Sequence, residues 1–215
     1  VDIIELDLRS TSDDAIVVLH DRTVDRTTDG TGRVSGLNLA ALRRLTVEPE
    51  GGKDAARDHV PTLVEVLELS RPHKAKLLLD IKDGGRLDLA TVIREARDNH
   101  LPDRIVVGVR RLADLKAVKA IDPDVTTLAF VSAQSEIDAF IAGGVDIVRL
   151  WSDWIVADPA APARIQGKGR KVWALMGRMV PGESEALRAL HERIRCASVD
   201  AIITDTPQIL LQTRQ

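Results

Sequence analysis

The sequence predicts an α/β protein built as a TIM-like barrel of parallel strands, and three observations support this fold class. Short apolar runs alternate with longer segments of helical periodicity to the end of the chain. Runs such as KLLLDIK and DIVRL are almost continuously apolar, as is typical of parallel strands buried on both faces. The chain has 215 residues and no low-complexity linker, so we expect a single domain over residues 1–215.

The strands and helices follow one another in a regular order. Strands are expected at Asp2–Leu8, Ile16–His20, Lys76–Lys82, Arg104–Gly108, Thr126–Val131, Val145–Leu150, Lys171–Met176 and Ala201–Thr204. Helices are expected at Thr62–Ser70, Leu87–Asn99, Leu112–Ala120, Ser135–Ala142, Pro159–Gly167, Glu183–Arg195 and Pro207–Gln212. Thr62 with Glu65 three residues later predicts a capping box at the start of the first helix.

Counting these units against a complete barrel leaves one missing. Six strand–helix units follow from Lys76 onward, and the strand at Asp2–Leu8 makes a seventh. A (β/α)₈ barrel needs eight such units. Either the fold is an open sheet, or the first strand and helix lie in a segment that this sequence does not contain. The abrupt start of the sequence in a strand favours the second alternative, which is the one we expect.

Composition and charge exclude several classes of function. The 30 basic and 33 acidic residues are well mixed and leave a net charge of −3, which does not favour nucleic-acid binding. No apolar run approaches the roughly 18 residues of a membrane span, so we expect a soluble protein without stable membrane insertion. The lone Cys196 excludes an internal disulfide and leaves the compartment open, with the cytoplasm favoured over secretion. The oligomeric state is also open.

Charged residues inside two apolar strands are the first candidates for chemistry. Because residues i and i+2 of a strand share a face, IIELDL places Glu5 and Asp7 together, and LLLDIKD does the same for Asp80 and Lys82. Three convergent carboxylates predict a site for a divalent metal, Mg²⁺ or Ca²⁺. The alternative is that Glu5 and Asp7 face solvent on an edge strand and that Asp80 forms a plain ion pair with Lys82.

One histidine and one tryptophan are further candidates. His20 ends a predicted strand, where barrel enzymes carry catalytic groups, and is a candidate general acid or base. Trp173 lies in the strand KVWAL and is a candidate to face a ligand. The other histidines, which are His59, His73, His100 and His191, are expected at the surface. No glycine-rich phosphate loop or nucleophile elbow is present.

In order and spacing, the motifs resemble the glycerophosphodiester phosphodiesterase family. The match rests on Glu-x-Asp, His-Asp and Arg-Thr-Thr-x-Gly-x-Gly in the first 82 residues, then on VPTLVEVLE, KVWAL and VDAIITDTP. The resemblance implies a TIM-like barrel that uses a divalent metal to hydrolyse glycerophosphodiesters to glycerol 3-phosphate and an alcohol. It also implies that Glu5, Asp7 and Asp80 bind the metal, that His20 is the second catalytic histidine and that Lys82 contacts substrate.

The sequence departs from the family at two places. Asp80 stands where the family usually has Glu, and its shorter side chain reaches about one methylene less, which predicts weaker or shifted metal contact. The family's first strand, with its His-Arg pair, and its Glu-Asn-Thr helix are absent from this sequence. These are the strand and helix that the barrel count also lacks.

Two other functions stay open beside hydrolysis of small glycerophosphodiesters. The first is a related barrel phosphodiesterase of the lysophospholipase D or sphingomyelinase D type, although no amphipathic basic helix suggests an approach to lipid. The second is a non-catalytic barrel remnant that binds a ligand or partner. The joint presence of Glu5, Asp7, His20 and Lys82 favours the enzyme.

Overall fold

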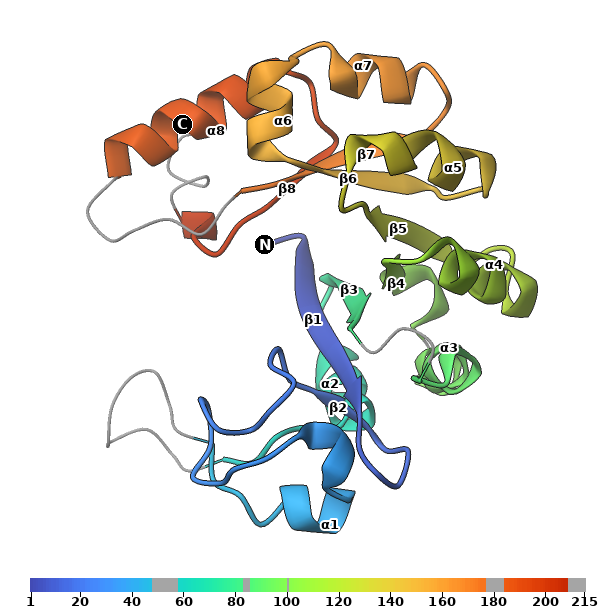
Figure 1. Cartoon of the computed structure of the whole chain (residues 1–215), viewed down its shortest axis with the longest axis vertical. Helices are drawn as coiled ribbons and strands as arrows, with labels where there is room; N and C mark the ends of the chain where they lie inside the picture. The colour runs from blue at the N-terminus through green and yellow to red at the C-terminus, as the bar shows by residue number, and fades with distance from the viewer. Residues whose placement is uncertain (48–57, 83–85, 100, 177–183, 209–215) are drawn as a thin grey trace. The chain divides into compact units, whose positions relative to one another are not determined.

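The computed structural model describes residues 1–47, 58–82, 86–99, 101–176 and 184–208 (Figure 1). The chain divides into two compact units, Asp2–Val125 and Thr126–Gln215, and each is described by itself. All eight predicted strands are present, with ends that shift by a few residues. The prediction of a single domain stays a prediction.

The unit Asp2–Val125 is built on a four-stranded sheet in the order β2-β1-β3-β4. Its strands are β1 (Ile3–Ser10), β2 (Ile16–Val18), β3 (Lys76–Ile81) and β4 (Ile105–Val109). β1, β3 and β4 are parallel, whereas β2 runs antiparallel to β1. The helical segments are η1 (Val34–Gly36), α1 (Leu39–Leu42), α2 (Leu63–Ser70), α3 (Leu89–Asp98), η2 (Pro102–Arg104) and α4 (Leu112–Ile121). α3 packs against both α2 and α4.

The unit Thr126–Gln215 is a parallel sheet in the order β5-β6-β7-β8. Its strands are β5 (Thr126–Phe130), β6 (Ile147–Trp151), β7 (Lys171–Leu175) and β8 (Ala201–Ile203). The helical segments are η3 (Gln134–Glu136), α5 (Ile137–Ala142), α6 (Ser152–Ala157), α7 (Ala161–Gln166) and α8 (Ser184–Cys196). Sequential parallel strands joined by helices are the connection that the alternating sequence pattern predicts.

Burial along the strands follows the apolar runs. In β3, Leu77, Leu78, Leu79 and Ile81 are each at most 1% exposed, so side chains on both faces of this strand are covered. All five residues of β4 are buried as well. This burial confirms the interpretation of continuous apolar runs as strands covered on both sides. No helix in the described part of the chain combines the length and apolar character needed to span a membrane.

The start of α2 forms as the sequence predicts. The Thr62 hydroxyl accepts the backbone N–H of Glu65 at 3.3 Å, and the Glu65 carboxylate accepts the backbone N–H of Thr62 at 2.8 Å. This capping box satisfies two backbone donors that an α-helix leaves without intrahelical partners.

Several elements differ from the expectation. The predicted strand Ile16–His20 ends at Val18, and it pairs antiparallel with β1 because five residues cannot form the long crossover that a parallel pair requires. The short helices α1 and α6 are not predicted. The predicted helix Pro207–Gln212 extends outside the described residues beyond position 208.

His191 is not at the surface, so this prediction was wrong. The residue is 1% exposed in α8, on the same helical face as the buried Leu187 and Ile194. Burial lowers the pKa of its imidazole. Spacings of three and four residues place these side chains in one stripe, which faces the interior.

Candidate active site

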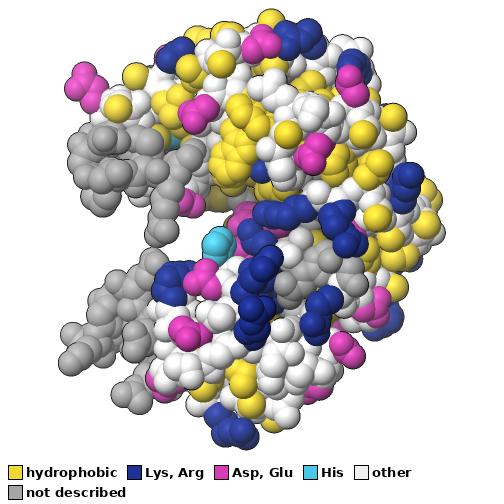
Figure 2. Space-filling view, viewed as in Figure 1, with side chains coloured by type: hydrophobic (Ala, Val, Ile, Leu, Met, Phe, Trp, Pro, Cys, Tyr) yellow, Lys and Arg dark blue, Asp and Glu magenta, His cyan; other side chains and the backbone are white. Residues whose placement is uncertain are grey.

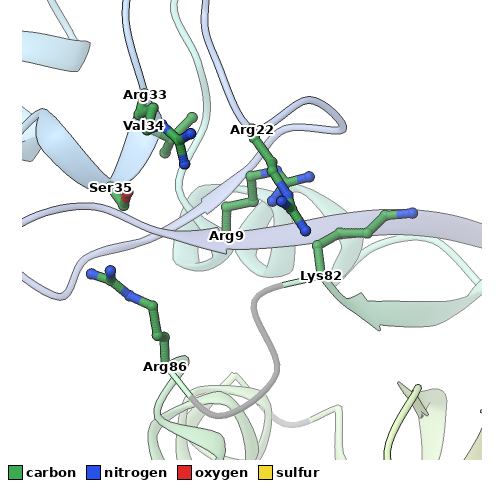
Figure 3. Close-up of a pocket in the computed structure, with 7 residues that line it drawn as sticks. All are labelled: Arg9, Arg22, Arg33, Val34, Ser35, Lys82 and Arg86. Carbon is green, nitrogen blue, oxygen red and sulfur yellow. The ribbon is translucent and has the colours of Figure 1, made fainter.

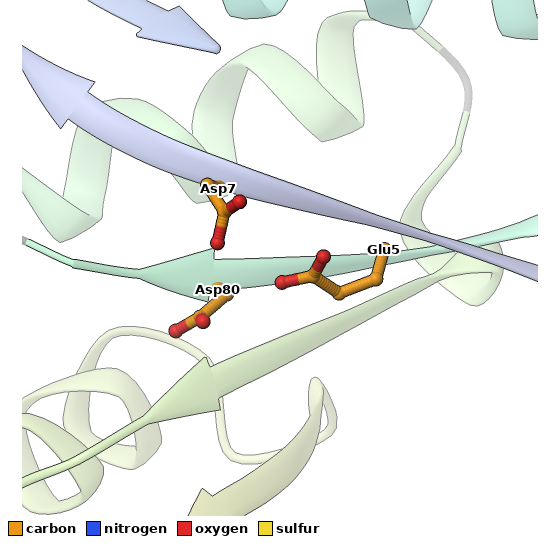
Figure 4. Close-up of side chains that lie close together, drawn as sticks. All are labelled: Glu5, Asp7 and Asp80. Atoms are coloured by element: carbon orange, nitrogen blue, oxygen red, sulfur yellow. The ribbon is translucent and has the colours of Figure 1, made fainter. Parts of the chain in front are cut away.

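Three carboxylates meet across β1 and β3 (Figure 4). Glu5 and Asp7 project from the same face of β1, and Asp7 lies opposite Asp80 in the parallel register with β3. One oxygen from each carboxylate lies within 4.8 Å of the others. The same-face placement predicted from IIELDL and LLLDIKD is therefore confirmed.

Two cationic side chains contact this carboxylate cluster. The Lys82 ammonium lies 2.8 Å from both Asp7 and Asp80, so it joins the two strands. Arg110, directly after β4, forms a bidentate pair with Asp80 at 2.5 and 2.8 Å. Asp80 is only 1% exposed, and an unpaired charge at such a position costs several kcal/mol. Lys82 and Arg110 together stabilise its ionised form.

Sequence reasoning missed Arg110. The available signal was a basic residue immediately after a buried strand, in GVRRL. Asp80 on β3 is in register with Gly108 on β4, and Arg110 comes two residues after Gly108. The pair therefore depends on which strand neighbours β3 and in which register, and neither can be read from the charge pattern alone.

The electrostatics of the cluster leave room for a further cation. Part of the Glu5 side chain reaches solvent, but burial of its carboxyl group, followed by the charges of Asp7 and Asp80, raises its pKa to about 8. Burial also raises the pKa of Asp80, and Arg110 and Lys82 oppose that rise. The positive charges of Lys82 and Arg110 thus balance only part of the negative charge that the three carboxylates carry when all are ionised.

The donor set fits a divalent metal. Mg²⁺ and Ca²⁺ prefer oxygen ligands, and oxygens that share one ion at roughly 2.0–2.6 Å lie no more than about 5 Å apart. The 4.8 Å limit within the carboxylate cluster meets this condition. Glu5, Asp7 and Asp80 are therefore the described residues that could hold such an ion.

His20 lies beside the same stretch of β1. The backbone N–H of Leu19 donates to the carbonyl of Asp7 at 2.9 Å, so the chain still follows β1 when it reaches His20. The Arg9 guanidinium donates to the carbonyl of His20 at 3.1 and 2.6 Å and fixes the backbone there. The imidazole itself is 67% exposed and accessible to substrate.

The His20 ring is oriented by its neighbour. Its Nδ1 lies 2.7 Å from an Asp21 oxygen, and the other Asp21 oxygen accepts a hydrogen bond from Arg26 at 2.6 Å. The bond from Arg26, followed by that from His20, lowers the pKa of Asp21 to about 2. An ionised carboxylate only accepts hydrogen bonds, so Nδ1 carries the proton and Nε2 is available for proton exchange.

Trp173 lies in the other unit. It is 6% exposed in the middle of β7, in register with Arg149 on β6 and Ala201 on β8. Its predicted contact with a ligand stays a prediction.

The family model for the glycerophosphoryl diester phosphodiesterase family matches residues 1–209. The chain belongs to this family. Its membership places it among the phosphoric diester hydrolases and confirms the resemblance carried by the Glu-x-Asp and His-Asp motifs.

One curated relative supports this placement, and two solved structures show the same fold. The glycerophosphodiester phosphodiesterase of Caldanaerobacter subterraneus is 33% identical over 211 residues, which are 97% of this chain and 84% of the relative. A phosphodiesterase from Oleispira antarctica, solved with the product sn-glycerol-3-phosphate, superposes with a TM-score of 0.85 at 21% identity and covers 100% of this chain and 86% of its own. The glycerophosphodiester phosphodiesterase from Agrobacterium tumefaciens superposes with a TM-score of 0.79 at 23% identity, over 98% and 87% of the two chains. The TIM-like α/β fold predicted for this family member is thus confirmed.

Proposed function

We propose that this family member hydrolyses glycerophosphodiesters to glycerol 3-phosphate and an alcohol, with a divalent metal and with His20 as acid–base catalyst. The observation that supports this most is the convergence of Glu5, Asp7 and Asp80 beside an imidazole that Asp21 orients. A ligand-binding remnant would have no need for this combination.

The described residues have separate roles in this proposal. Glu5, Asp7 and Asp80 hold the ion, which supplies positive charge to a non-bridging phosphate oxygen. Lys82, next to the cluster, adds a second positive contact to the substrate. His20 accepts or donates a proton at Nε2, and Asp21 stabilises the imidazolium form.

Asp80 contributes least to metal binding in this arrangement. A carboxylate offers about four lone-pair positions. Arg110 occupies one on each Asp80 oxygen, and Lys82 contacts Oδ2 as well. One position on Oδ1 remains, so Asp80 can give the ion a single contact while Glu5 and Asp7 supply the others.

Release of glycerol 3-phosphate tests the proposed function directly. We expect the purified chain to hydrolyse glycerophosphocholine, and treatment with EDTA to lower the rate by at least about 100-fold until Mg²⁺ or Ca²⁺ is restored. A coupled glycerol 3-phosphate assay measures both rates. Hydrolysis that EDTA leaves intact contradicts the metal role, and faster hydrolysis of lysophosphatidylcholine than of glycerophosphocholine indicates a lysophospholipase D instead.

Metal binding is expected to become tighter as the pH rises towards 8. The Glu5 carboxyl, with its pKa of about 8, is mostly protonated at pH 7, and an incoming ion must displace that proton. Binding should therefore release most of a proton at pH 7 and little at pH 9. Calorimetry in buffers of different ionisation enthalpy counts these protons. Glu5→Gln should remove the release, and an unchanged proton count in this variant contradicts the assignment.

A further inference from the structure

A cavity of about 260 Å³ in the unit Asp2–Val125 is lined mainly by cationic side chains (Figure 3). Five of the seven described lining residues are basic, and the other two are Val34 and Ser35. The basic residues come from β1, from the loop after β2, and from positions just after β3 and shortly before α3. They are Arg9, Arg22, Arg33, Lys82 and Arg86. Figure 2 shows several Lys and Arg side chains gathered together on one face. No carboxylate is among the lining residues that belong to the described part of the chain. The cavity is smaller than the roughly 300–1,000 Å³ of pockets for drug-sized ligands, so it suits a small anion.

Structural ion pairs account for only part of this positive charge, because Lys82 pairs with Asp7 and Asp80. Within the described ranges, no acidic side chain pairs with Arg22, Arg33 or Arg86. Like charges that surround one cavity repel one another unless an anion enters it. Guanidinium groups form bidentate, charge-assisted hydrogen bonds with phosphate and carboxylate oxygens.

The loop that carries two of these arginines is held in place. Thr23 and Arg33 form an antiparallel bridge, and the N–H of Val34 donates to the carbonyl of Arg22 at 3.0 Å. Val24 and Val34, next to them, are at most 1% exposed in a small apolar core. Gly32 permits the turn, because its φ of +112° is rarely adopted by residues with a side chain. The cavity wall is therefore preformed.

The cavity lies beyond the carboxylate cluster along the strands. Arg9 follows Asp7 by two residues on β1, which is roughly 6.5 Å further on the same face. Lys82 likewise follows Asp80 by two residues. It belongs to both the carboxylate cluster and the cavity, because it contacts Asp7 and Asp80 and also lines the cavity. A group bound here is thus adjacent to the reacting phosphate and separate from it.

We propose that this cavity binds a second phosphate, carried by the alcohol half of the substrate. This inference rests on the proposed function and narrows its substrate class to glycerophosphodiesters whose alcohol bears a phosphate monoester. A phosphate monoester, with a charge of about −1.5 to −2, balances several cations better than a single carboxylate does. The Ser35 hydroxyl supplies a neutral donor beside the arginines.

A matched pair of substrates tests this proposal. Glycerophosphoglycerol and its derivative phosphorylated on the terminal glycerol differ only in the second phosphate. We expect kcat/KM to be at least about tenfold higher for the phosphorylated substrate, mainly through a lower KM, as charge-assisted hydrogen bonds allow. In the double variant Arg22→Gln/Arg33→Gln the ratio of the two kcat/KM values should fall to about one. Arg44→Gln, which removes an exposed arginine outside the cavity lining, should keep the wild-type ratio.

A binding measurement separates this proposal from the proposed function. Titration with inorganic phosphate in metal-free buffer should show binding to the wild type that weakens at least about tenfold in the double variant but not in Arg44→Gln. The expected phosphate binding does not require that any diester is hydrolysed. Absence of hydrolysis with normal phosphate binding therefore rejects only the proposed function. Equal loss of kcat/KM for both substrates in the double variant, or unchanged phosphate binding, overturns the second-phosphate proposal.

Discussion

The double substitution Glu5→Gln/Asp7→Asn is expected to abolish divalent-metal binding and to lower kcat/KM by at least about 10³-fold. Both carboxylates lie on one face of β1, and Asp80 has only about one acceptor position left after its contacts with Arg110 and Lys82. The two amides have nearly the same size and shape as the carboxylates they replace. The substitutions therefore remove the negative charge and change the packing little. Calorimetric titration with Mg²⁺ and with Ca²⁺, beside the glycerol 3-phosphate assay, measures both effects.

The control for this double variant is Asp2→Asn. Asp2 is an exposed carboxylate just before the same strand and lies outside the cluster. It should change neither metal affinity nor rate. The double variant should keep a cooperative thermal transition, because Lys82 retains its contact with Asp80. Metal binding that survives in the folded double variant contradicts the assignment of Glu5 and Asp7 as ligands.

Replacing His20 by Ala is expected to lower kcat by about 10²–10⁴-fold and to leave metal affinity unchanged. The expected loss concerns the proposed proton transfer at Nε2, whereas the proposed metal site is formed by carboxylates from β1 and β3. A separate measurement of metal binding and turnover distinguishes this variant from the carboxylate variant. Near-wild-type turnover in His20→Ala contradicts the catalytic assignment.

Two further variants make the His20 result specific. Asp21→Asn keeps a hydrogen-bond acceptor for Nδ1 but removes the charge that stabilises the imidazolium, so we expect a smaller loss than in His20→Ala. His73→Ala removes another exposed histidine of the same unit and should have no effect on rate. A loss in Asp21→Asn that equals or exceeds the His20→Ala loss contradicts the orienting role of Asp21.

The parts of the fold that follow from local periodicity were predictable from sequence. Continuous apolar runs indicated the strands, and the two-residue period of a strand placed Glu5 and Asp7 on one face. His191 could also have been predicted as buried, because it continues the stripe of Leu187 and Ile194 at spacings of four and three residues. Helices as short as α1 and α6 show too few residues for a helical period to emerge.

The parts that depend on pairing between distant segments were not predictable. Arg110 lies 30 residues from Asp80 along the chain, and its contact requires both the neighbourhood of β3 and β4 and their register. The link from Arg26 through Asp21 to His20 requires the conformation of the loop after β2. Arg22 and Arg26 lie four residues apart in the sequence, and only the folded loop shows that Arg26 pairs with Asp21 whereas Arg22 lines the cavity.

Arg110 has a consequence for product release that follows from charge neutrality. With Glu5 ionised, the three carboxylates face two cationic side chains, so the cluster carries one net negative charge. In the proposed function, a bound divalent ion would turn this into one positive charge, which a singly charged phosphodiester would neutralise. The glycerol 3-phosphate product carries nearly two negative charges and leaves the same cluster with an excess of negative charge. In the proposed function, the pairing of Arg110 with Asp80 would thus match the charge of the metal-loaded site to that of the substrate and favour departure of the product.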